Sequence, residues 1–381
     1  MLENKIRDIF RKKFGKEPEV IVKSPGRINI IGEHTDYNLG YVLPAAIENY
    51  MFIGLSKNDS GEFNLYSLDY NESFTASHDT IKESGTSWLN LVYGVIHQLK
   101  DDISGFDLVF CGDIPEGAGL SSSAALCCGT GFGISRLFDL NIENWDIAKI
   151  AQKSEHDFAH VQCGIMDQFA CIFGLTNHVL LLDCLDLSYK ESPIDISGHK
   201  FVLINSNVKH ELNESDYNAR RKESAKALEI IQSRFPEINS YRDVTESLMN
   251  DCKSALSGML WKRAYHIVSE NQRVLDVNDS LRNNNLTHVG ELLTAGHHSL
   301  KDNYEVTCPE TDFLVEELIK DKNFYGARQV GGGFGGCVLA IAKDANINEV
   351  LEVVNKHYKR EFRKKITKIP IRISKGCHVV D

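Results

Sequence analysis

The apolar and polar positions in the first half of the chain predict a lobe that combines strands with a few helices. Apolar residues recur at helical spacing up to about residue 14, so we expect an opening helix that packs against this lobe. An alternation typical of a β-strand begins at Glu19 and is interrupted at residues 24–26, where Ser-Pro-Gly favours a turn. Three further apolar segments predict strands, at residues 51–55, 63–66 and 106–111.

One predicted helix carries a charged residue at the edge of its inner side. Residues 144–161 have the clearest amphipathic pattern of the chain. The apolar face of this helix is formed by Ile147, Ala151, Ser154 and Phe158. Glu155 lies at the edge of that face. A buried carboxylate is costly unless it meets a cation or several donors, and magnesium is a natural partner for it.

The second half of the chain has longer helical stretches. After a strand-like segment at residues 201–204, helical spacing is found at residues 216–234 and at about 255–300. The chain ends with a predicted strand, helix and strand, at residues 338–342, 349–362 and 369–373. We therefore expect an N-terminal lobe of residues 1–190 and a C-terminal lobe of residues 191–381.

Composition excludes several classes of protein. A formal net charge of −11 argues against binding to nucleic acid or to an anionic membrane surface, because both need a basic protein surface. The ten cysteines include no Cys-x-x-Cys pair, so reduced thiols are expected. The charged first residues do not resemble a signal peptide, and no stretch is apolar enough to span a membrane. We expect a cytoplasmic protein whose partners are small molecules, acting as a monomer.

A glycine-rich turn stands directly before three serines at residues 115–126, PEGAGLSSSAAL. Glycines let the backbone approach an anion closely, the N–H groups of a helix start point at it, and serine hydroxyls add donors or a magnesium ligand. A serine-capped helix after an ordinary turn is the alternative. The segment lacks the lysine of a P-loop, so another cation must help to bind phosphate.

Two other segments place polar side chains among apolar neighbours. Asp167 stands within CGIMDQF, a setting that raises a carboxyl pKa or aims the group at a substrate hydroxyl. The alternative is that Asp167 caps the helix that follows. Residues 26–38, GRINIIGEHTDYN, bring carboxylates, an imidazole and amides into one turn, as the binding of sugar hydroxyls requires. A polar surface loop is the alternative there.

A glycine cluster at residues 331–336 contains the spacing Gly-x-Gly-x-x-Gly. The dinucleotide motif with this spacing opens a helix after a first strand, whereas here the glycines lead into a strand-like segment at residues 337–342. We therefore expect a close backbone approach to a phosphate or to the serine-rich turn. His156 and His160 are spaced to share a helix face, but we predict that they lie on its solvated side and bind no metal.

Together these motifs resemble the galactokinase family, in the superfamily that also contains homoserine, mevalonate and phosphomevalonate kinases. The resemblance spans essentially the whole chain. Its matching segments are residues 26–38, 117–125 and 331–337, with support from residues 163–168 and 216–221. It implies a two-lobed α/β fold of the α+β type, with the active site in the cleft between the lobes.

The resemblance also implies a reaction, the transfer of the γ-phosphoryl group of ATP to the anomeric hydroxyl of galactose with Mg²⁺. Asp167 would be the catalytic acid that accepts or orients the proton of this hydroxyl, and Arg27 would stabilise negative charge beside it. Galactose would be bound by Glu33, His34, Asp36, Gly164 and Tyr217. ATP would be bound by Ser67, Trp88, Gly117, Ala118, Gly119, Leu120, Ser121, Ser122 and Ser123. Magnesium would be bound by Ser123 and Glu155.

Two alternatives remain beside this hypothesis. A related kinase could act on N-acetylgalactosamine, galacturonate or arabinose, but Thr35 and the Asp-Tyr-Asn that follows it favour unsubstituted galactose. A catalytically silent galactose sensor is the second alternative, and the intact serine segment with Arg27 and Asp167 argues against it. The chain departs from the family pattern at Gln329-Val330, usually Met-Thr, and at Leu185, usually arginine; neither position is assigned to the chemistry.

Overall fold

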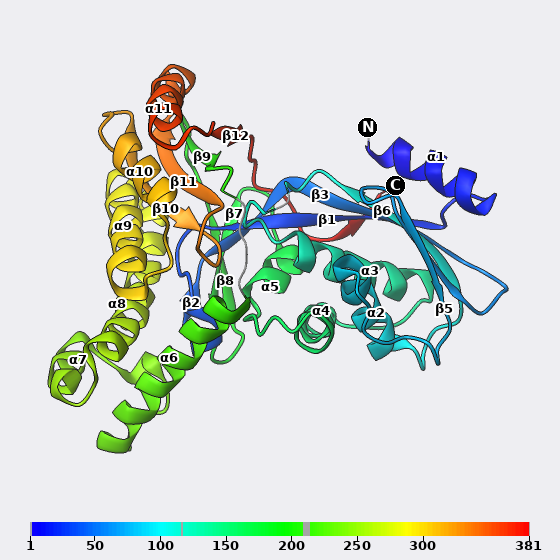
Figure 1. Cartoon of the computed structure of the whole chain (residues 1–381), viewed down its shortest axis with the longest axis horizontal. Helices are drawn as coiled ribbons and strands as arrows, with labels where there is room; N and C mark the ends of the chain where they lie inside the picture. The colour runs from blue at the N-terminus through cyan, green and yellow to red at the C-terminus, as the bar shows by residue number, and fades with distance from the viewer. Residues whose placement is uncertain (1, 116, 209–213, 381) are drawn as a thin grey trace.

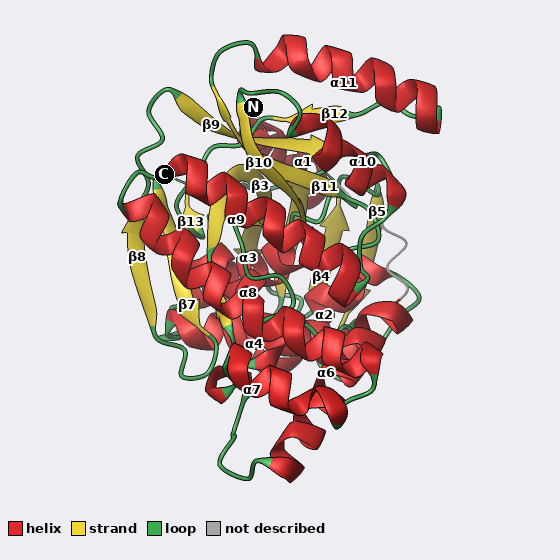
Figure 2. Cartoon of the chain, turned by 90° about the vertical axis from the view of Figure 1, so that its left-hand side faces the viewer, coloured by secondary structure: helices red, strands yellow, loops and turns green. Residues whose placement is uncertain are grey.

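The protein is described from a computed structural model that covers residues 2–115, 117–208 and 214–380. Two groups of elements lie side by side (Figure 1): a large sheet with helices on both faces, and a group of long helices beside a smaller sheet. Figure 2, in which the left-hand side of Figure 1 faces the viewer, shows α8 and α9 in front of these sheets. The first group has the strands and helices predicted for the first half of the chain, and the second has the long helices and strands predicted for the second half.

The large sheet has the strand order β13-β1-β3-β6-β4-β5. Its strands are β1 (Val20–Asn29), β3 (Pro44–Lys57), β4 (Phe63–Ser67), β5 (Glu72–Ala76), β6 (Phe106–Gly112) and β13 (His378–Val379). The opening helix α1 (Leu2–Phe14) packs Ile6 and Phe10 against one face, as predicted. The other face is covered by α2 (Ser87–Leu99), α3 (Ser122–Leu137), α4 (Asn144–Phe158) and α5 (Met166–Phe173).

Helix α3 lies unusually close to the sheet, and this fixes the serine-rich turn before it. A Cβ atom on Gly129 would lie 2.5 Å from Ile53 Cδ1, and one on Gly133 would lie 2.6 Å from Leu55 Cδ1. Larger residues at these two positions would push α3 away from β3. The start of α3 is therefore held beside the end of β1.

The break predicted at residues 24–26 is a register shift inside β1. The strand continues to Asn29, and its pairing with β3 shifts between Pro25 and Arg27. At this point β1 meets the serine-rich turn, since a Cβ atom on Gly26 would lie 2.8 Å from the Leu120 carbonyl oxygen. The backbone N–H of Arg27 donates to the same carbonyl at 3.1 Å. The irregularity thus brings Arg27 to the turn.

The remaining elements form two smaller sheets and a group of helices. One sheet has the order β10-β11-β9-β12, with β9 (His199–Asn205), β10 (Phe324–Val330), β11 (Cys337–Lys343) and β12 (Thr367–Ile369). The other comprises β2 (Tyr41–Val42), β7 (His178–Asp183) and β8 (Tyr189–Pro193). The helices are α6 (Glu214–Arg234), α7 (Glu246–Asp251), α8 (Gly258–Arg282), α9 (Leu286–Ser299), α10 (Pro309–Leu318) and α11 (Ile347–Phe362). Short turns of 3-10 helix are Asp36–Asn38, Tyr241–Asp243 and Cys252–Ser254, and a π-helical turn is Leu300–Tyr304.

Three predicted boundaries are wrong. The stretch at 255–300 is two helices, α8 and α9, because three consecutive asparagines separate them and Asn284 adopts a left-handed φ of 56°. The helix predicted to residue 161 ends at Phe158. The strand predicted at 369–373 lies at 367–369 instead; Pro370 follows it, and Ile373 forms only an isolated bridge.

The largest hydrophobic cluster among the described residues crosses the predicted lobe boundary. It joins Ile53 and Leu108 of the large sheet to Leu203, Val289 and Ile341 of the second half. A division at residue 190 stays a prediction. No helix in the described part of the chain is both long and apolar enough to cross a membrane.

Candidate active site

A cavity of about 380 Å³ lies where segments from both halves of the chain meet. Most of the residues that the sequence assigns to a site line it. These are Arg27, Glu33, His34, Asp36, Gly117, Gly119, Leu120, Ser121, Ser122, Ser123, Glu155, Asp167 and Tyr217. Residues not assigned in advance also line it, namely Pro115, Val161, Cys163, Met166, Asn218, Gly331 and Gly332.

Arg27 and Asp167 form a bidentate ion pair in this cavity. Arg27 Nε donates to Asp167 Oδ1 at 2.6 Å, and a terminal nitrogen of Arg27 donates to Oδ2 at 2.7 Å. Its other terminal nitrogen donates to the Gly119 carbonyl at 2.5 Å. Burial alone would lower the pKa of Arg27, but the charge and hydrogen bonds of Asp167 outweigh it and the pKa is raised. A permanent cation is therefore fixed between the carboxylate and the serine-rich turn.

The serine-rich turn is not a simple helix cap. Ser121 adopts a left-handed φ of 60° and makes no capping hydrogen bond for α3. Its hydroxyl donates to Asp167 Oδ2 instead. A left-handed serine is strained, and such strain often marks a functional site. Ser122 and Ser123, in the first turn of α3, line the cavity, so an anion there would meet the N–H groups of a helix start.

The capping alternative for Asp167 is also wrong. Helix α5 begins at Met166, and its N-cap residue is Ile165. Asp167 lies in the first turn, and its carboxylate accepts from Arg27 and Ser121 rather than from the backbone of its own helix. The start of α5 thus points Asp167 into the cavity.

The glycine cluster closes the cavity from the second half of the chain. A Cβ atom on Gly331 would lie 3.3 Å from the Cα atom of Gly119, and both glycines have positive φ angles, 88° and 73°. This confirms the predicted close backbone approach to the serine-rich turn. The Gly331 N–H also donates to Glu33 Oε1 at 2.9 Å. Backbone from residues 119 and 331 therefore lies side by side above the sugar motif.

Glu155 and Ser123 form a fitting pair for a divalent cation. Glu155 is 5% exposed, and its Oε1 has no hydrogen-bond partner among the described residues. Burial raises the pKa of Glu155, hydrogen bonds with Ser123 and Cys163 lower it, and the charge of Asp167 raises it further. A buried, unpartnered carboxylate oxygen beside a hydroxyl suits Mg²⁺, which takes a few protein oxygens and completes its shell with phosphate and water.

Glu33 and Asp36 differ in how they are held. Glu33 is 2% exposed and pairs with the buried Arg328 at 2.9 Å, which joins the two halves of the chain. Asp36 has no ion-pair partner among the described residues, and burial, followed by the charges of Asp167 and Glu33, raises its pKa to about 7. A Cβ atom on Gly164 would lie 2.0 Å from Asp36 Oδ2. Glycine at 164 therefore leaves the room that the Asp36 carboxylate occupies.

His34 and Tyr217 form an aromatic wall of the cavity. Their ring centroids lie 5.6 Å apart. His34 Nδ1 lies 2.8 Å from the Tyr37 hydroxyl, whereas Nε2 has no partner among the described residues. Burial, with the nearby charges of His266 and Arg220, lowers the pKa of His34 to about 3. The imidazole is therefore neutral, with one nitrogen available to a ligand.

A second cavity of about 670 Å³ adjoins the first and shares Ser122, Ser123, Glu155 and Val161 with it. Trp88 lines this second cavity and donates from Nε1 to Glu72 at 2.7 Å. Ser67 and Ala118, also assigned to nucleotide binding, are buried and line neither cavity. The assignment of these two residues to nucleotide binding stays a prediction, because neither of them borders a cavity in which the nucleotide could bind.

Sequence reasoning missed several lining residues. Asn218 follows Tyr217 in α6, and its buried Oδ1 has no partner among the described residues. The signal was present, because the segment at 216–221 was already one of the matching motifs. Cys163 and Met166 gave no signal, since an apolar or sulfur side chain in a cavity wall is indistinguishable in sequence from one in the core.

Three protein-family models match the chain. They are the GHMP kinases N terminal domain at residues 90–175, the galactokinase galactose-binding signature at residues 8–57, and the GHMP kinases C terminal domain at residues 277–360. The signature contains Arg27, Glu33, His34 and Asp36, and the N-terminal domain contains the serine-rich turn and Asp167. The matches therefore cover both sides of the cavity.

Relatives and solved structures point the same way. The galactokinase of Thermotoga petrophila is 40% identical over 94% of this chain and 99% of its own, and that of Haemophilus influenzae is 38% identical over 98% of each. The crystal structure of Lactococcus lactis galactokinase complexed with galactose covers all of both chains with a TM-score of 0.96 and 35% identity. Methanococcus jannaschii mevalonate kinase, at a TM-score of 0.66 and 18% identity, shares the fold. The predicted GHMP-kinase fold is thus confirmed, and the chain belongs to the galactokinase family.

Proposed function

We propose that the chain transfers the γ-phosphoryl group of ATP to the anomeric hydroxyl of galactose, releasing galactose 1-phosphate and ADP. The observation that carries the proposal is the junction of Arg27, Asp167 and Ser121, which joins a carboxylate, a cation and a phosphate-type loop at one point of the cavity. Phosphoryl transfer depends mainly on positioning and charge neutralisation, and these three groups supply both.

Asp167 would hold the attacking hydroxyl. Its two oxygens already accept hydrogen bonds from Arg27 and Ser121, so the position of the carboxylate is fixed before substrate arrives. The sugar hydroxyl donates to this carboxylate, which aligns the oxygen with the phosphorus and receives the proton as the new bond forms. Arg27 offsets the negative charge that develops on the transferred group.

The nucleotide would occupy the second cavity and the serine-rich turn. We call residues 117–123 with Glu155 the nucleotide end of the site. The nucleoside lies against Trp88, and the phosphates lie at the start of α3. Ser123 and Glu155 would hold magnesium, which supplies charge neutralisation on the phosphates when it is bound.

Galactose would occupy the first cavity. We call Glu33, His34, Asp36 and Tyr217 the sugar end of the site. The two carboxylates accept from sugar hydroxyls, and the tyrosine and histidine rings pack against the sugar. The crystal structure of Lactococcus lactis galactokinase complexed with galactose supports galactose as the ligand of this end, since that protein aligns with this chain over its whole length.

We also propose that the protein acts as a monomer in the cytoplasm with only small-molecule partners. All ten cysteines are unpaired thiols, which suits a reducing compartment. The net charge of −11 supports the expectation that neither nucleic acid nor an anionic membrane is a partner. Light scattering of the purified chain, giving a mass near 42.8 kDa, tests the monomer.

One assay tests the reaction. ADP release is measured with galactose, N-acetylgalactosamine, galacturonate and arabinose, using wild type, Asp167→Ala and the exposed-turn variant Asp186→Ala. We expect galactose to be turned over at least about tenfold better than the other sugars. We expect Asp167→Ala to lose more than about two orders of magnitude in kcat, the scale for removing an acid–base group.

The remaining outcomes decide against the proposal. Comparable turnover by Asp167→Ala, with Asp186→Ala as the unaffected control, removes Asp167 from the mechanism. If another sugar is turned over faster than galactose, that sugar is the substrate instead. A wild type that binds ATP and galactose and yet releases no ADP supports a sensor instead.

A further inference from the structure

Two tyrosine hydroxyl groups form a hydrogen-bonded pair next to His34. The Tyr37 hydroxyl lies 2.8 Å from His34 Nδ1 and 3.0 Å from the hydroxyl of Tyr304. Tyr304 is fully buried and ends the π-helical turn Leu300–Tyr304. Its ring packs 4.7 Å from the ring of His34 and 4.6 Å from that of His266, centroid to centroid. Residues far apart in sequence thus meet at the sugar end.

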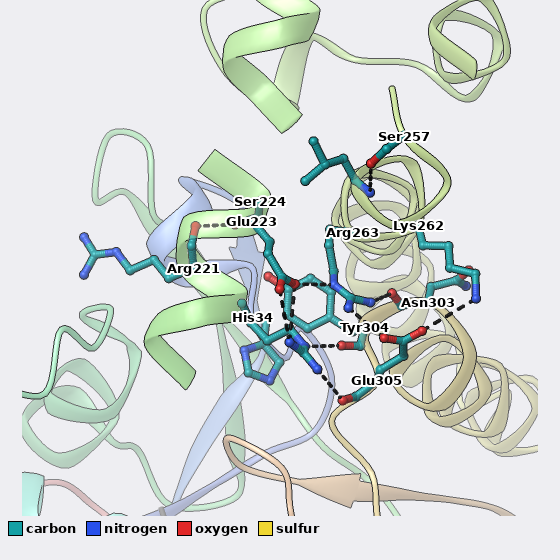
Figure 3. A network of polar contacts seen from close by, with 12 residues as sticks. His34, Arg221, Glu223, Ser224, Ser257, Lys262, Arg263, Asn303, Tyr304 and Glu305 are labelled. Atoms are coloured by element: carbon teal, nitrogen blue, oxygen red, sulfur yellow. Dashed lines mark hydrogen bonds and ion pairs between the residues drawn. The ribbon is translucent and has the colours of Figure 1, made fainter. Parts of the chain in front are cut away.

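An ionic network fixes the backbone around Tyr304 (Figure 3). Arg263, 1% exposed, donates to the Asn303 carbonyl and to the Glu305 carboxylate at 2.7 Å. Arg220 of α6 donates to the carbonyl oxygens of Tyr304 at 2.7 Å and Glu305 at 3.0 Å. Glu305 adopts a left-handed φ of 54°. Short π-helical turns and left-handed residues are costly, and here the buried Arg263 and the partly buried Arg220 hold them in place.

A second set of hydrogen bonds ties α6 to the backbone of His34. The Ser224 hydroxyl donates to Asn38 Oδ1 at 3.0 Å, and Asn38 Nδ2 donates to the His34 carbonyl at 2.8 Å. Both the ring and the backbone of His34 are therefore anchored to the second half of the chain. Such double anchoring is what precise orientation of a side chain requires.

Acid and base strengths decide which way the hydrogen bonds run. Since His34 is neutral, either Nδ1 or Nε2 carries its proton. An imidazole nitrogen is a much stronger base than a phenolic oxygen, and a phenol is a stronger acid than a neutral imidazole. The favoured arrangement has the Tyr37 hydroxyl donating to His34 Nδ1 while the Tyr304 hydroxyl donates to Tyr37. The His34 proton then resides on Nε2.

We propose that Tyr37, supported by Tyr304, is a positioning residue that holds His34 as the Nε2–H tautomer and so presents an N–H donor to the sugar. The carboxylates of Glu33 and Asp36 that share the cavity offer acceptors. A hydroxyl bound there donates to a carboxylate and accepts from His34, so both of its hydrogen-bonding functions are met. The inference rests on the proposed binding of galactose at this end.

The direct test locates the His34 proton by ¹⁵N NMR of the ligand-free protein. Histidine is ¹⁵N-labelled, and the His34 signals are assigned by comparison with a His34→Gln protein. We expect one neutral tautomer with the proton on Nε2 in wild type and a mixture of both tautomers in Tyr37→Phe. Tyr304→Phe is expected to shift the population less, since Tyr37 keeps its hydroxyl.

Steady-state kinetics give the second readout. We expect Tyr37→Phe to raise KM for galactose roughly fivefold to tenfold, with KM for ATP and kcat within about twofold of wild type, the scale of one lost hydrogen bond. The matched control is Tyr241→Phe. Tyr241 is a buried tyrosine in the same hydrophobic cluster as Tyr304, and its hydroxyl donates at 2.6 Å to the Ser224 carbonyl. Its loss should leave KM for galactose unchanged.

Each outcome decides for or against the inference. A wild-type proton on Nδ1, or a mixture of tautomers in wild type, overturns it without any variant. A His34 spectrum that is the same in Tyr37→Phe also overturns it, as does an equal rise of galactose KM in the Tyr241→Phe control. Failure of the wild type to phosphorylate galactose overturns the proposed function instead, and the spectra, which need no turnover, still decide the tautomer.

Discussion

The nucleotide end of the cavity is built mainly from backbone and hydroxyl groups of one short segment, to which Glu155 of α4 adds a single carboxylate, whereas the sugar end is built from side chains that both halves of the chain hold in place. At the nucleotide end, small residues let α3, β1 and the glycine cluster approach closely, as at Gly129 and Gly331. At the sugar end, Glu33 depends on Arg328 and His34 depends on Tyr37.

This difference has a physical consequence. Glycines and helix starts bind anions without burying a charge, so the nucleotide end buries only the Glu155 carboxylate and needs little other support. The sugar end buries two carboxylates: Glu33 is matched by Arg328 from the second half of the chain, and Asp36, without such a cation among the described residues, has a raised pKa instead. Substitutions of distant residues that support the sugar end should therefore weaken sugar binding and leave nucleotide binding unchanged. The predictions below separate the two ends in this way.

The largest effect is expected where the two ends meet. Arg27→Met removes the cation that joins Asp167 to Gly119, so both the alignment of the hydroxyl and the neutralisation of charge are lost. We expect kcat to fall roughly 10³-fold, the upper scale for removing one electrostatic contact to a transition state. Steady-state kinetics measure this. Arg11→Met, at an exposed arginine of α1, serves as control, and a loss below about tenfold would contradict the role of Arg27.

The next effect tests the support of the sugar end. Arg263→Met leaves the Glu223 and Glu305 carboxylates without their buried cation. We expect the free energy of unfolding to drop by about 2–3 kcal/mol, less than for a fully buried pair because Glu305 is partly exposed. KM for galactose should rise while KM for ATP is kept.

Denaturant titration of this variant and of Lys262→Met makes the comparison. Lys262 is the sequence neighbour of Arg263 and also pairs with Glu305, at 3.7 Å, but its side chain is 45% exposed, against 1% for Arg263. Its loss should change stability by less than about 0.5 kcal/mol. An equal drop in the free energy of unfolding in the two variants would show that the buried ion pairs of Arg263 stabilise the fold no more than the exposed pair of Lys262.

The same contrast explains what the sequence could predict. The serine-rich turn, Glu155 and the glycine cluster were identified because each is a continuous segment whose chemistry is local. The opening helix and the strands β1, β3, β4, β6, β9 and β11 followed from periodicity for the same reason. The junction of Arg27 and Asp167 needed the family resemblance, since no spacing rule relates positions 140 residues apart.

The support of the sugar end could not be predicted. Tyr37 and Tyr304 are 267 positions apart, and a tyrosine in a helical segment is typical of a core residue. The left-handed conformation of Glu305 has no sequence signal either, because glutamate rarely adopts it. The helix boundary at Asn284 was missed although asparagine favours that conformation, because apolar periodicity continued on both sides of it.

A third prediction addresses the nucleotide end alone. Glu155→Ala removes the carboxylate beside Ser123, whose Oε1 has no hydrogen-bond partner among the described residues, so magnesium should bind more weakly. We expect the Mg²⁺ concentration for half-maximal activity to rise by about one order of magnitude, with KM for galactose unchanged. Activity measured across a magnesium titration checks this. The exposed Glu143→Ala just before α4 is the control, and an unchanged magnesium dependence in Glu155→Ala would remove Glu155 from the cation site.

The smallest effect comes from the pH dependence of the sugar end. Burial, with the charges of Asp167 and Glu33, raises the pKa of Asp36 to about 7, above its usual value in the unfolded chain. Between those two values the folded protein binds more protons than the unfolded one, so this group lowers stability as pH rises through the window, and the cost is fully present above about pH 7.

Asp36→Asn removes that cost. We expect the variant to have a free energy of unfolding about 1–2 kcal/mol above wild type at pH 8, with most of the difference lost by pH 4, because the folded carboxyl is then neutral and the unfolded one is only about half ionised. KM for galactose should rise, since the amide replaces a carboxylate acceptor. Denaturant titrations at both pH values test this in the absence of sugar. Asp186→Asn, at an exposed turn where Ser188 lowers the carboxyl pKa, should show no gain at pH 8. A gain in both variants would reflect only the lower net negative charge, whereas a gain confined to Asp36→Asn means that the sugar end holds a carboxylate at the expense of stability.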